Sequence, residues 1–179
     1  MPSPAHALKH GIALLPEDRR NQGLIRNFSV RENATLPSLA RFRRWSWFPS
    51  PSAKQERDAT VTLLKQLDVH AAPDKPVGLL SGGNQQKIVL TKWLLSNIDI
   101  FIFDEPTQGI DVEVKEDIFA LIRSLAVDNK AVIFISSELA ELERVASRVL
   151  VLREGRLVAE LFGREISENR VLEACYETA

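Results

Sequence analysis

The chain has 179 residues, a formal net charge of −1 and one cysteine. A charge so near zero excludes the overall basic field that nucleic-acid-binding proteins often carry, and a single thiol excludes a disulfide framework or a cysteine-rich metal site. No apolar run is long enough to span a bilayer, and the first residues lack the apolar core of a secretory signal. We therefore expect a globular, cytosolic protein that acts on a membrane, if at all, from its surface.

The first part of the chain predicts a strand followed by a helix. Residues 11–15 form a short apolar run that stops at Pro16 and is followed by a charged loop, which is typical of a strand that ends in a loop. Ser29 and Glu32 have the spacing of a capping box. This pattern predicts that a helix begins after Ser29.

Residues 41–53, RFRRWSWFPSPSA, interleave basic and aromatic residues ahead of two prolines. One interpretation is a membrane-surface or nucleic-acid patch. The other is a surface connector in which Trp45, Trp47 and Phe48 pack locally, and we favour it because the basic cluster is short and isolated.

Helical periodicity returns after this stretch. Apolar residues at helical spacing predict a helix over residues 54–68, and two prolines make residues 71–78 a linker. The sequence LLSGGNQQKIVLTKWLL then predicts an amphipathic helix that ends near Leu95.

The second half predicts a parallel sheet. Residues 98–103 and 131–135 are apolar runs typical of buried strands, and the apolar residues from Val114 to Leu125 follow the period of a helix. This strand–helix–strand unit predicts an α/β sheet covered on both faces. The other expected elements are a helix over residues 137–146, a hairpin of residues 149–152 and 157–161, and a helix over residues 168–176.

Two adjacent carboxylates, Asp104 and Glu105, follow the apolar run 98–103. Carboxylates at the end of a buried strand are costly unless a cation neutralises them, and Mg²⁺ needs only one or two protein carboxylates when phosphates and waters complete its shell. The pattern is that of a Walker B motif, in which Asp104 would hold the metal. Glu105 would orient the attacking water or accept its proton.

Ser81, Gly82 and Gly83 stand directly ahead of a predicted helix. A helix start offers free N–H groups and a positive dipole end to a phosphate, and glycine allows close approach of the backbone. Yet no lysine follows any glycine, so the chain holds no P-loop of the Gly-Lys-Ser/Thr type.

These motifs together resemble the nucleotide-binding domain of ABC transporters. LSGGNQQK is similar to the ABC signature, IFIFDEP to Walker B and QGIDV to the D-loop, and the resemblance runs from HGIALLPEDRRNQGL to the final hairpin. The chain resembles in particular the second ATPase domain of fused subunits that import ribose, galactose, xylose or arabinose. The resemblance implies an α/β, P-loop NTPase-like fold, N-terminally truncated, with a Q-loop region (1–28), a helical subdomain (29–95) and a Walker B core with a C-terminal hairpin (96–179).

The resemblance also implies a composite ATP and Mg²⁺ site. In this family two nucleotide-binding domains meet head to tail, so Ser81, Gly82 and Gly83 would hold the γ-phosphate of ATP on the P-loop of a second domain. Gln85 is a further expected nucleotide-binding residue. Asp111 would reach across the interface as part of the D-loop.

Three departures from the family's pattern bear on hydrolysis at the chain's own site. The P-loop is missing, Glu17 stands at the Q-loop glutamine position, and Ser137 stands at the switch histidine position. Because serine cannot replace histidine as a charged or tautomeric donor, we expect the isolated chain to be inactive.

The implied partners are a second nucleotide-binding domain, membrane permease subunits and, indirectly, a periplasmic sugar-binding protein, with no nucleic acid. The expected location is the cytoplasmic face of the plasma membrane, and the expected role is to energise monosaccharide import. Two alternatives stay open: a soluble ABC-type ATPase of DNA repair or translation, and a non-catalytic or regulatory half.

Overall fold

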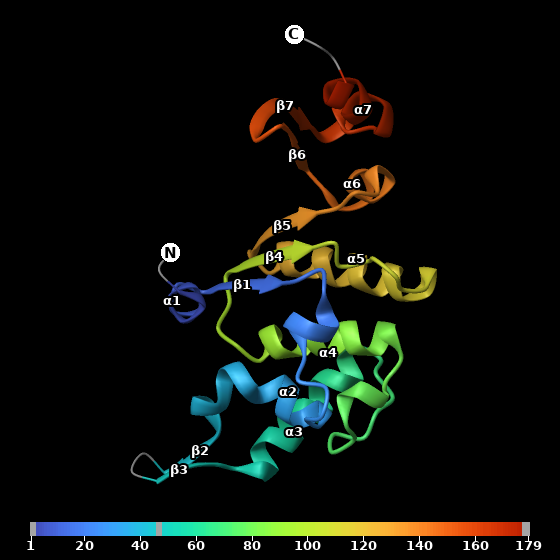
Figure 1. The fold of residues 1–179 in the computed structure, drawn as a ribbon. Coiled ribbons are helices and arrows are strands. Elements are labelled where there is room, and N and C mark those ends of the chain that lie inside the picture. Colours follow the sequence, from blue (N-terminus) through green and yellow to red (C-terminus); the bar gives the residue numbers. More distant parts are fainter. Residues whose placement is uncertain (1–2, 46–47, 177–179) are drawn as a thin grey trace.

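A computed structural model describes residues 3–45 and 48–176 of the chain, without the side chains of residues 44–49. A three-stranded parallel sheet lies between a helical region and a C-terminal block (Figure 1). Its strands, in the order β1-β4-β5, are β1 (Ile12–Leu15), β4 (Ile100–Asp104) and β5 (Ala131–Ile135). The α/β class and the parallel core predicted from the sequence are confirmed.

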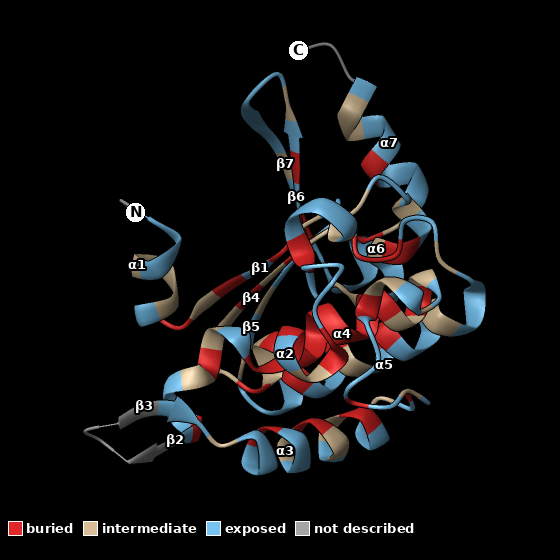
Figure 2. Ribbon diagram, turned by 60° about the horizontal axis from the view of Figure 1, so that its bottom comes forward, coloured by how far each residue is buried: buried red, intermediate tan, exposed pale blue. Residues whose placement is uncertain are grey.

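One face of this sheet packs on two helices, α4 (Gly82–Leu94) and α5 (Val112–Val127). Alternate strand residues point into this layer, because successive side chains of a strand project to opposite faces. Leu15 and Phe103 are paired in the register and have no exposed surface. Figure 2 shows the buried residues gathered between the sheet and these helices.

The other face of the sheet is uncovered, which corrects the prediction of a sheet covered on both faces. Leu14, Ile133 and Ile135 are 47–50% exposed, and they are not part of the core cluster that packs on α4 and α5. β5 is therefore half-exposed rather than the buried strand that its apolar sequence predicts. The reason is that both covering helices of the core, α4 and α5, pack on the same side.

The helical region is built on α4. Its elements are α1 (Pro4–Lys9), the π-helical turn η1 (Arg19–Gly23), α2 (Val30–Thr35), the 3₁₀ segment η2 (Leu36–Phe42), α3 (Ala53–Gln66) and η3 (Val77–Leu79). The predicted capping box is present: the amide of Glu32 donates to Ser29 Oγ at 3.2 Å, and Glu32 Oε2 accepts from the amide of Ser29 at 2.8 Å. This capped helix packs against both α3 and α4.

Residues 41–53 include a short antiparallel hairpin that the sequence does not predict, formed by β2 (Arg43–Trp45) and β3 (Phe48–Pro51). The predicted local packing of Trp45, Trp47 and Phe48 concerns side chains outside the described part of the chain.

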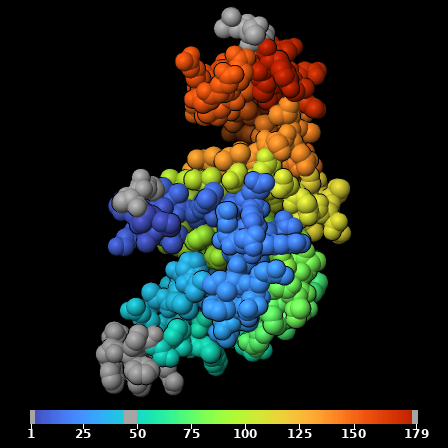
Figure 3. Space-filling model, viewed as in Figure 1, coloured from blue at the N-terminus to red at the C-terminus, as the bar shows by residue number. Residues whose placement is uncertain are grey.

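The C-terminal block has its own apolar cluster. It contains α6 (Leu139–Val145), β6 (Arg148–Arg153), β7 (Arg156–Phe162), η4 (Gly163–Glu165) and α7 (Glu168–Tyr176). Val149, Val151 and Leu161 of the hairpin pack on Val171 of α7, and Figure 3 shows this block at one end of the molecule. Among the described residues β6 pairs only with β7, and one edge of β5 has no partner strand.

Candidate nucleotide-binding site

The start of α4 has two backbone amides without a hydrogen-bond partner among the described residues, at the partly exposed Gly82 and the buried Gly83. Ser81 is the N-cap residue and is exposed, and its Oγ accepts from the amide of Asn84 at a long 3.4 Å. The amides of Gly82 and Gly83 have no acceptor among the described residues. Free N–H groups at the positive end of a 13-residue helix can hold an anion. Of the predicted phosphate-binding residues, Ser81 and Gly82 reach the surface, whereas Gly83 is buried.

Both glycines also have a reason within the chain. A Cβ at Gly83 would stand 2.8 Å from Val114 Cγ2 of α5, and a Cβ at Gly82 would stand 2.8 Å from Arg19 Nη2. Distances below 3.0 Å require a neighbour to move. The glycine pair thus permits the tight packing of α4 as well as close approach of a ligand.

Gln85 does not point out of the helix start. Its side chain is buried, and Nε2 donates to the carbonyl of Leu80 at 3.0 Å. In this structure the side-chain amide closes a local turn ahead of α4, so its predicted contact with the nucleotide would require another rotamer.

The acidic pair stands at the carboxyl end of β4. Asp104 pairs in register with Ile135 of β5, and the amide of Glu105 donates to the carbonyl of Ile135 at 3.0 Å. Glu105 has φ +45°, a left-handed conformation that is uncommon for a residue other than glycine. Such outliers concentrate at functional sites. Neither carboxylate has a hydrogen bond or ion pair to another described side chain.

The acidic pair fits Mg²⁺ that arrives with phosphate. The described residues contain no group of three or more His, Cys, Asp or Glu side chains that could hold a metal alone. Mg²⁺ typically takes one or two carboxylates and completes its shell with phosphate and water. Asp104 and Glu105 suit that role and do not suit a metal bound by protein ligands only.

The carboxyl ends of the three parallel strands bring several predicted residues to one edge of the sheet. Glu17 follows β1 and is exposed, Asp104 ends β4 and Glu105 follows it, and Ser137 follows β5 and is exposed. Ligands of open α/β sheets bind at this edge. Asp111 caps α5, is exposed, and makes no side-chain bond to the helix start.

A buried carboxylate that sequence reasoning missed joins the loops after β4 and β5. Glu141 Oε2 accepts from Thr107 Oγ1 at 2.6 Å and from Ser136 Oγ at 3.0 Å, while Oε1 accepts from Lys115 Nζ at 2.9 Å. Glu141 is 5% exposed. Ser136, rather than Ser137, therefore makes the structural contacts in this segment, and it also accepts from the amide of Glu138 at 3.0 Å.

The charges of this cluster are mutually supported. Burial acts to raise the pKa of Glu141, but the hydrogen bonds from Thr107, Lys115 and Ser136 outweigh burial, so the pKa lies below its ordinary value. The hydrogen bond to Glu138, with a further contribution from Glu141, raises the pKa of Lys115. Glu141 and Lys115 are therefore both charged at neutral pH and hold the two loops in place.

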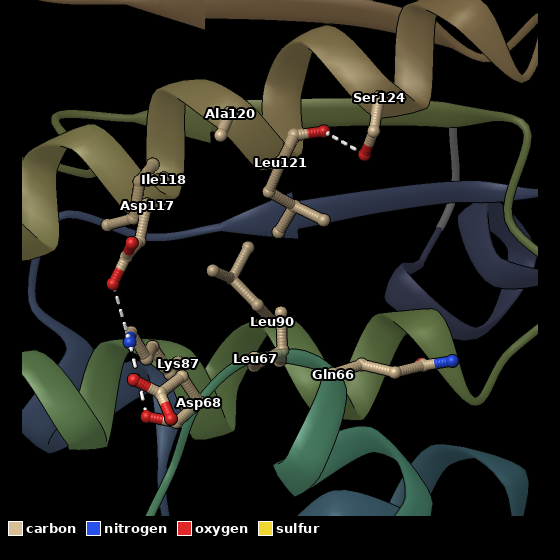
Figure 4. Close-up of a pocket in the computed structure, with 10 residues that line it drawn as sticks. All are labelled: Gln66, Leu67, Asp68, Lys87, Leu90, Asp117, Ile118, Ala120, Leu121 and Ser124. Atoms are coloured by element: carbon tan, nitrogen blue, oxygen red, sulfur yellow. Dashed lines mark hydrogen bonds and ion pairs between the residues drawn. The ribbon is translucent and has the colours of Figure 1, made fainter.

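A cavity of about 300 Å³ lies between α4 and α5 (Figure 4). Leu90 and Leu121 face each other across it, and at one end Lys87 Nζ forms an ion pair of 2.7 Å with Asp117. This cavity contains none of the predicted nucleotide-binding residues. Its ion pair instead fixes the two helices that cover the sheet.

Comparison with known proteins gives a consistent result. A family model described as "ABC transporter" matches residues 3–108. The chain is 47% identical over 170 residues to Ribose import ATP-binding protein RbsA 1 of Burkholderia thailandensis. The match covers 94% of this chain and 33% of that protein. It is 43% identical over 173 residues to Ribose import ATP-binding protein RbsA of Geobacillus kaustophilus. That match covers 96% of this chain and 34% of the relative. The chain thus spans about a third of the length of these curated relatives.

Solved structures share the fold. A nucleotide-free ATP-binding cassette from an ABC transporter superposes with a TM-score of 0.75 at 20% identity, covering 96% of this chain and 71% of that chain. A post-hydrolysis dimer of an ATP-binding cassette, bound to ADP and Pi, gives a TM-score of 0.69 at 24% identity and covers 84% and 62%.

Proposed function

Because the chain belongs to the ABC transporter family, we propose that it is part of an ATPase that drives monosaccharide import, and that it supplies the signature motif to ATP held by a second domain. The relatives at 43–47% identity are named for ribose import, which supports the class of substrate. The observation that carries the proposal is the start of α4, where two amides lack an acceptor among the described residues and the serine is exposed.

The residues at the start of α4 would act directly on the partner's nucleotide. The Ser81 hydroxyl and the amides of Gly82 and Gly83 would donate hydrogen bonds to γ-phosphate oxygens, and the helix dipole would add to the attraction. Such donors stabilise charge on the transferred phosphoryl group when they are held rigidly. Asp111, exposed at the start of α5, would approach the same interface.

Residues at the end of β4 would serve a second site. Asp104 would hold Mg²⁺, which when bound neutralises phosphate charge. Glu105 would orient water or accept its proton. With no Gly-Lys sequence in the chain, the phosphate cradle of that site would come from another polypeptide segment, and Ser137 would leave it without a histidine donor. We therefore propose that turnover depends mainly on the site to which α4 contributes.

No described helix is both long enough and apolar enough to cross a bilayer. We propose peripheral attachment at the cytoplasmic face of the membrane, through permease subunits that contact the Glu17 loop and the helical region 29–95. Closure of two ATPase domains around ATP would be the conformational step passed to the permease.

The proposed role can be tested by reconstitution with an ABC domain that carries a P-loop and lacks a functional signature. The chain alone should hydrolyse no ATP, and the mixture should turn over ATP faster than the partner alone. Ser81→Arg should return the mixture to the rate of the partner, because a long cationic side chain fills the phosphate position. Ser147→Arg is the matched control, since Ser147 is exposed in the C-terminal block. Robust ATPase activity of the chain alone would contradict the proposal.

A further inference from the structure

The side chain of Arg19 stands where three segments of the proposed site meet. Arg19 begins η1, two residues after Glu17. Its Nη1 donates to the carbonyl of Gln108 at 3.0 Å, and its Nη2 approaches the carbonyl of Gly109 at 3.4 Å. The same Nη2 lies against Gly82 at the start of α4, close enough that a Cβ there would be 2.8 Å away. One guanidinium therefore touches the turn ahead of Asp111 and the helix start that carries Ser81.

The surroundings of Arg19 differ from those of an ordinary surface arginine. Among the described residues no carboxylate forms an ion pair with it, and its Nε is buried without a hydrogen-bond partner. Burial lowers the pKa of the guanidinium, which nevertheless stays charged because its ordinary pKa is so high. Its hydrogen bonds go to main-chain carbonyls of a turn, so their effect is to fix that turn in space.

We propose that Arg19 is a positioning residue that fixes the 108–110 turn against the start of α4, so that Asp111 and Ser81 are presented together to the partner's nucleotide. The inference rests on the proposed function for its effect on turnover. Its structural part is that Arg19 joins the start of α4 to a turn whose residues Gln108 and Gly109 lie 89 and 90 residues further along the chain. This part does not depend on nucleotide.

The geometry explains why arginine and glycine occur together here. A guanidinium is a planar fork that can reach two carbonyls at once, whereas an ammonium is a compact charge on a flexible stem. A Cβ at Gly82 would come within 2.8 Å of Nη2, so the guanidinium would have to shift from its present position. Arg19 and Gly82 should therefore behave as a coupled pair in a double-mutant cycle.

The structural part is tested by hydrogen exchange on the chain alone. In Arg19→Lys, exchange in peptides covering residues 108–115 and 82–86 should become about tenfold faster, the order expected when one or two hydrogen bonds are lost. Peptides of the β6–β7 hairpin serve as an internal reference and should not change. Arg20→Lys is the matched control, because Arg20 is adjacent and exposed. Unchanged exchange in both peptides of Arg19→Lys would overturn the proposal.

The functional part is tested in the mixture with the P-loop-bearing domain. Arg19→Lys should lower kcat about tenfold or more, as a small misplacement of a site residue does, while KM for ATP changes little because the partner's P-loop binds the nucleotide. A mixture in which the wild-type chain gives no stimulation refutes the proposed function and leaves the exchange result to stand. Normal stimulation by wild type and by Arg19→Lys alike refutes the positioning role.

A second variant acts on the same contact from the other side. Gly82→Ala should displace the guanidinium and accelerate exchange in residues 108–115, and it should do so much less in an Arg19→Ala background. Additive effects of the two substitutions on that peptide would contradict the coupling. This cycle remains informative if Arg19→Lys proves too unstable to study.

Discussion

Replacement of Glu141 by glutamine tests whether the buried carboxylate holds the loops after β4 and β5. The three donors to this carboxylate are Thr107 Oγ1, Ser136 Oγ and Lys115 Nζ, at 2.6, 3.0 and 2.9 Å. A glutamine has the same shape, and its oxygen can still accept from Lys115. Its NH₂ group would then face two hydroxyls, which can reverse and act as acceptors.

The cost of Glu141→Gln follows from the loss of charge rather than of contacts. Hydrogen bonds to a charged group are stronger than neutral ones by about 1 kcal/mol each. With three such bonds and a nearly fully buried side chain, we expect the free energy of unfolding to fall by about 2–4 kcal/mol. At about 2–4 °C per kcal/mol for a chain of this size, Tm should fall by roughly 4–16 °C.

Thermal unfolding followed by circular dichroism at several pH values is the measurement. Since the folded-state pKa of Glu141 lies below its ordinary value of 4.5, its contribution to stability is fully present above that pH and is lost as the pH falls through the folded-state pKa. The difference in Tm between wild type and Glu141→Gln should therefore be constant near neutrality and shrink below pH 4.5. Glu113→Gln, on an exposed position of α5, should change Tm little. An equal Tm loss in Glu113→Gln, or a difference that persists in strong acid, would refute the reasoning.

Two further substitutions test the packing of α4 and the uncovered sheet face. Gly83→Ala should lower the free energy of unfolding by about 1–2 kcal/mol in urea titrations, because overpacking against Val114 outweighs the better helix propensity of alanine. Adding Val114→Ala to the same chain should recover most of this loss. A Gly83→Ala variant more stable than wild type would disprove the close contact. Ile133→Thr should lower the free energy of unfolding by less than about 1 kcal/mol, since Ile133 is 50% exposed, and it should reduce self-association in gel filtration. A decrease as large as that of a core residue would mean that this face of the sheet is covered in solution.

The elements that sequence reasoning located well are those with local signals. The strand β5 and the helix α7 match their predicted ranges at both ends, because apolar runs and helical spacing depend on near neighbours. The helix start at Ser29 was predictable from its capping box, which the structure contains. The strand predicted over residues 98–103 begins two residues before β4 does, because Ile98 is buried without being part of the strand. The apolar run alone therefore did not fix the residue at which the strand begins.

The errors and omissions share a different cause, which is contact between distant segments. Whether a strand is covered on one face or both depends on where helices elsewhere pack, so the exposure of Ile133 could not be read from its own segment. Arg19 and Glu141 looked like ordinary surface charges in the sequence, and their partners lie 89 and 34 residues away. Motif spacing predicted Ser81, Glu105 and Asp111 as site residues, whereas the residues that hold these segments in place became visible only in three dimensions.

The unpaired edge of β5 has a practical consequence for handling the isolated chain. Such an edge exposes a row of backbone donors and acceptors, and here it borders an apolar surface, a combination that favours sheet extension between molecules. The monomeric fraction of this chain should therefore fall as its concentration rises, because molecules associate through strand addition. A short peptide of strand-forming sequence, added in excess during refolding, should compete with that process and raise the yield of monomer.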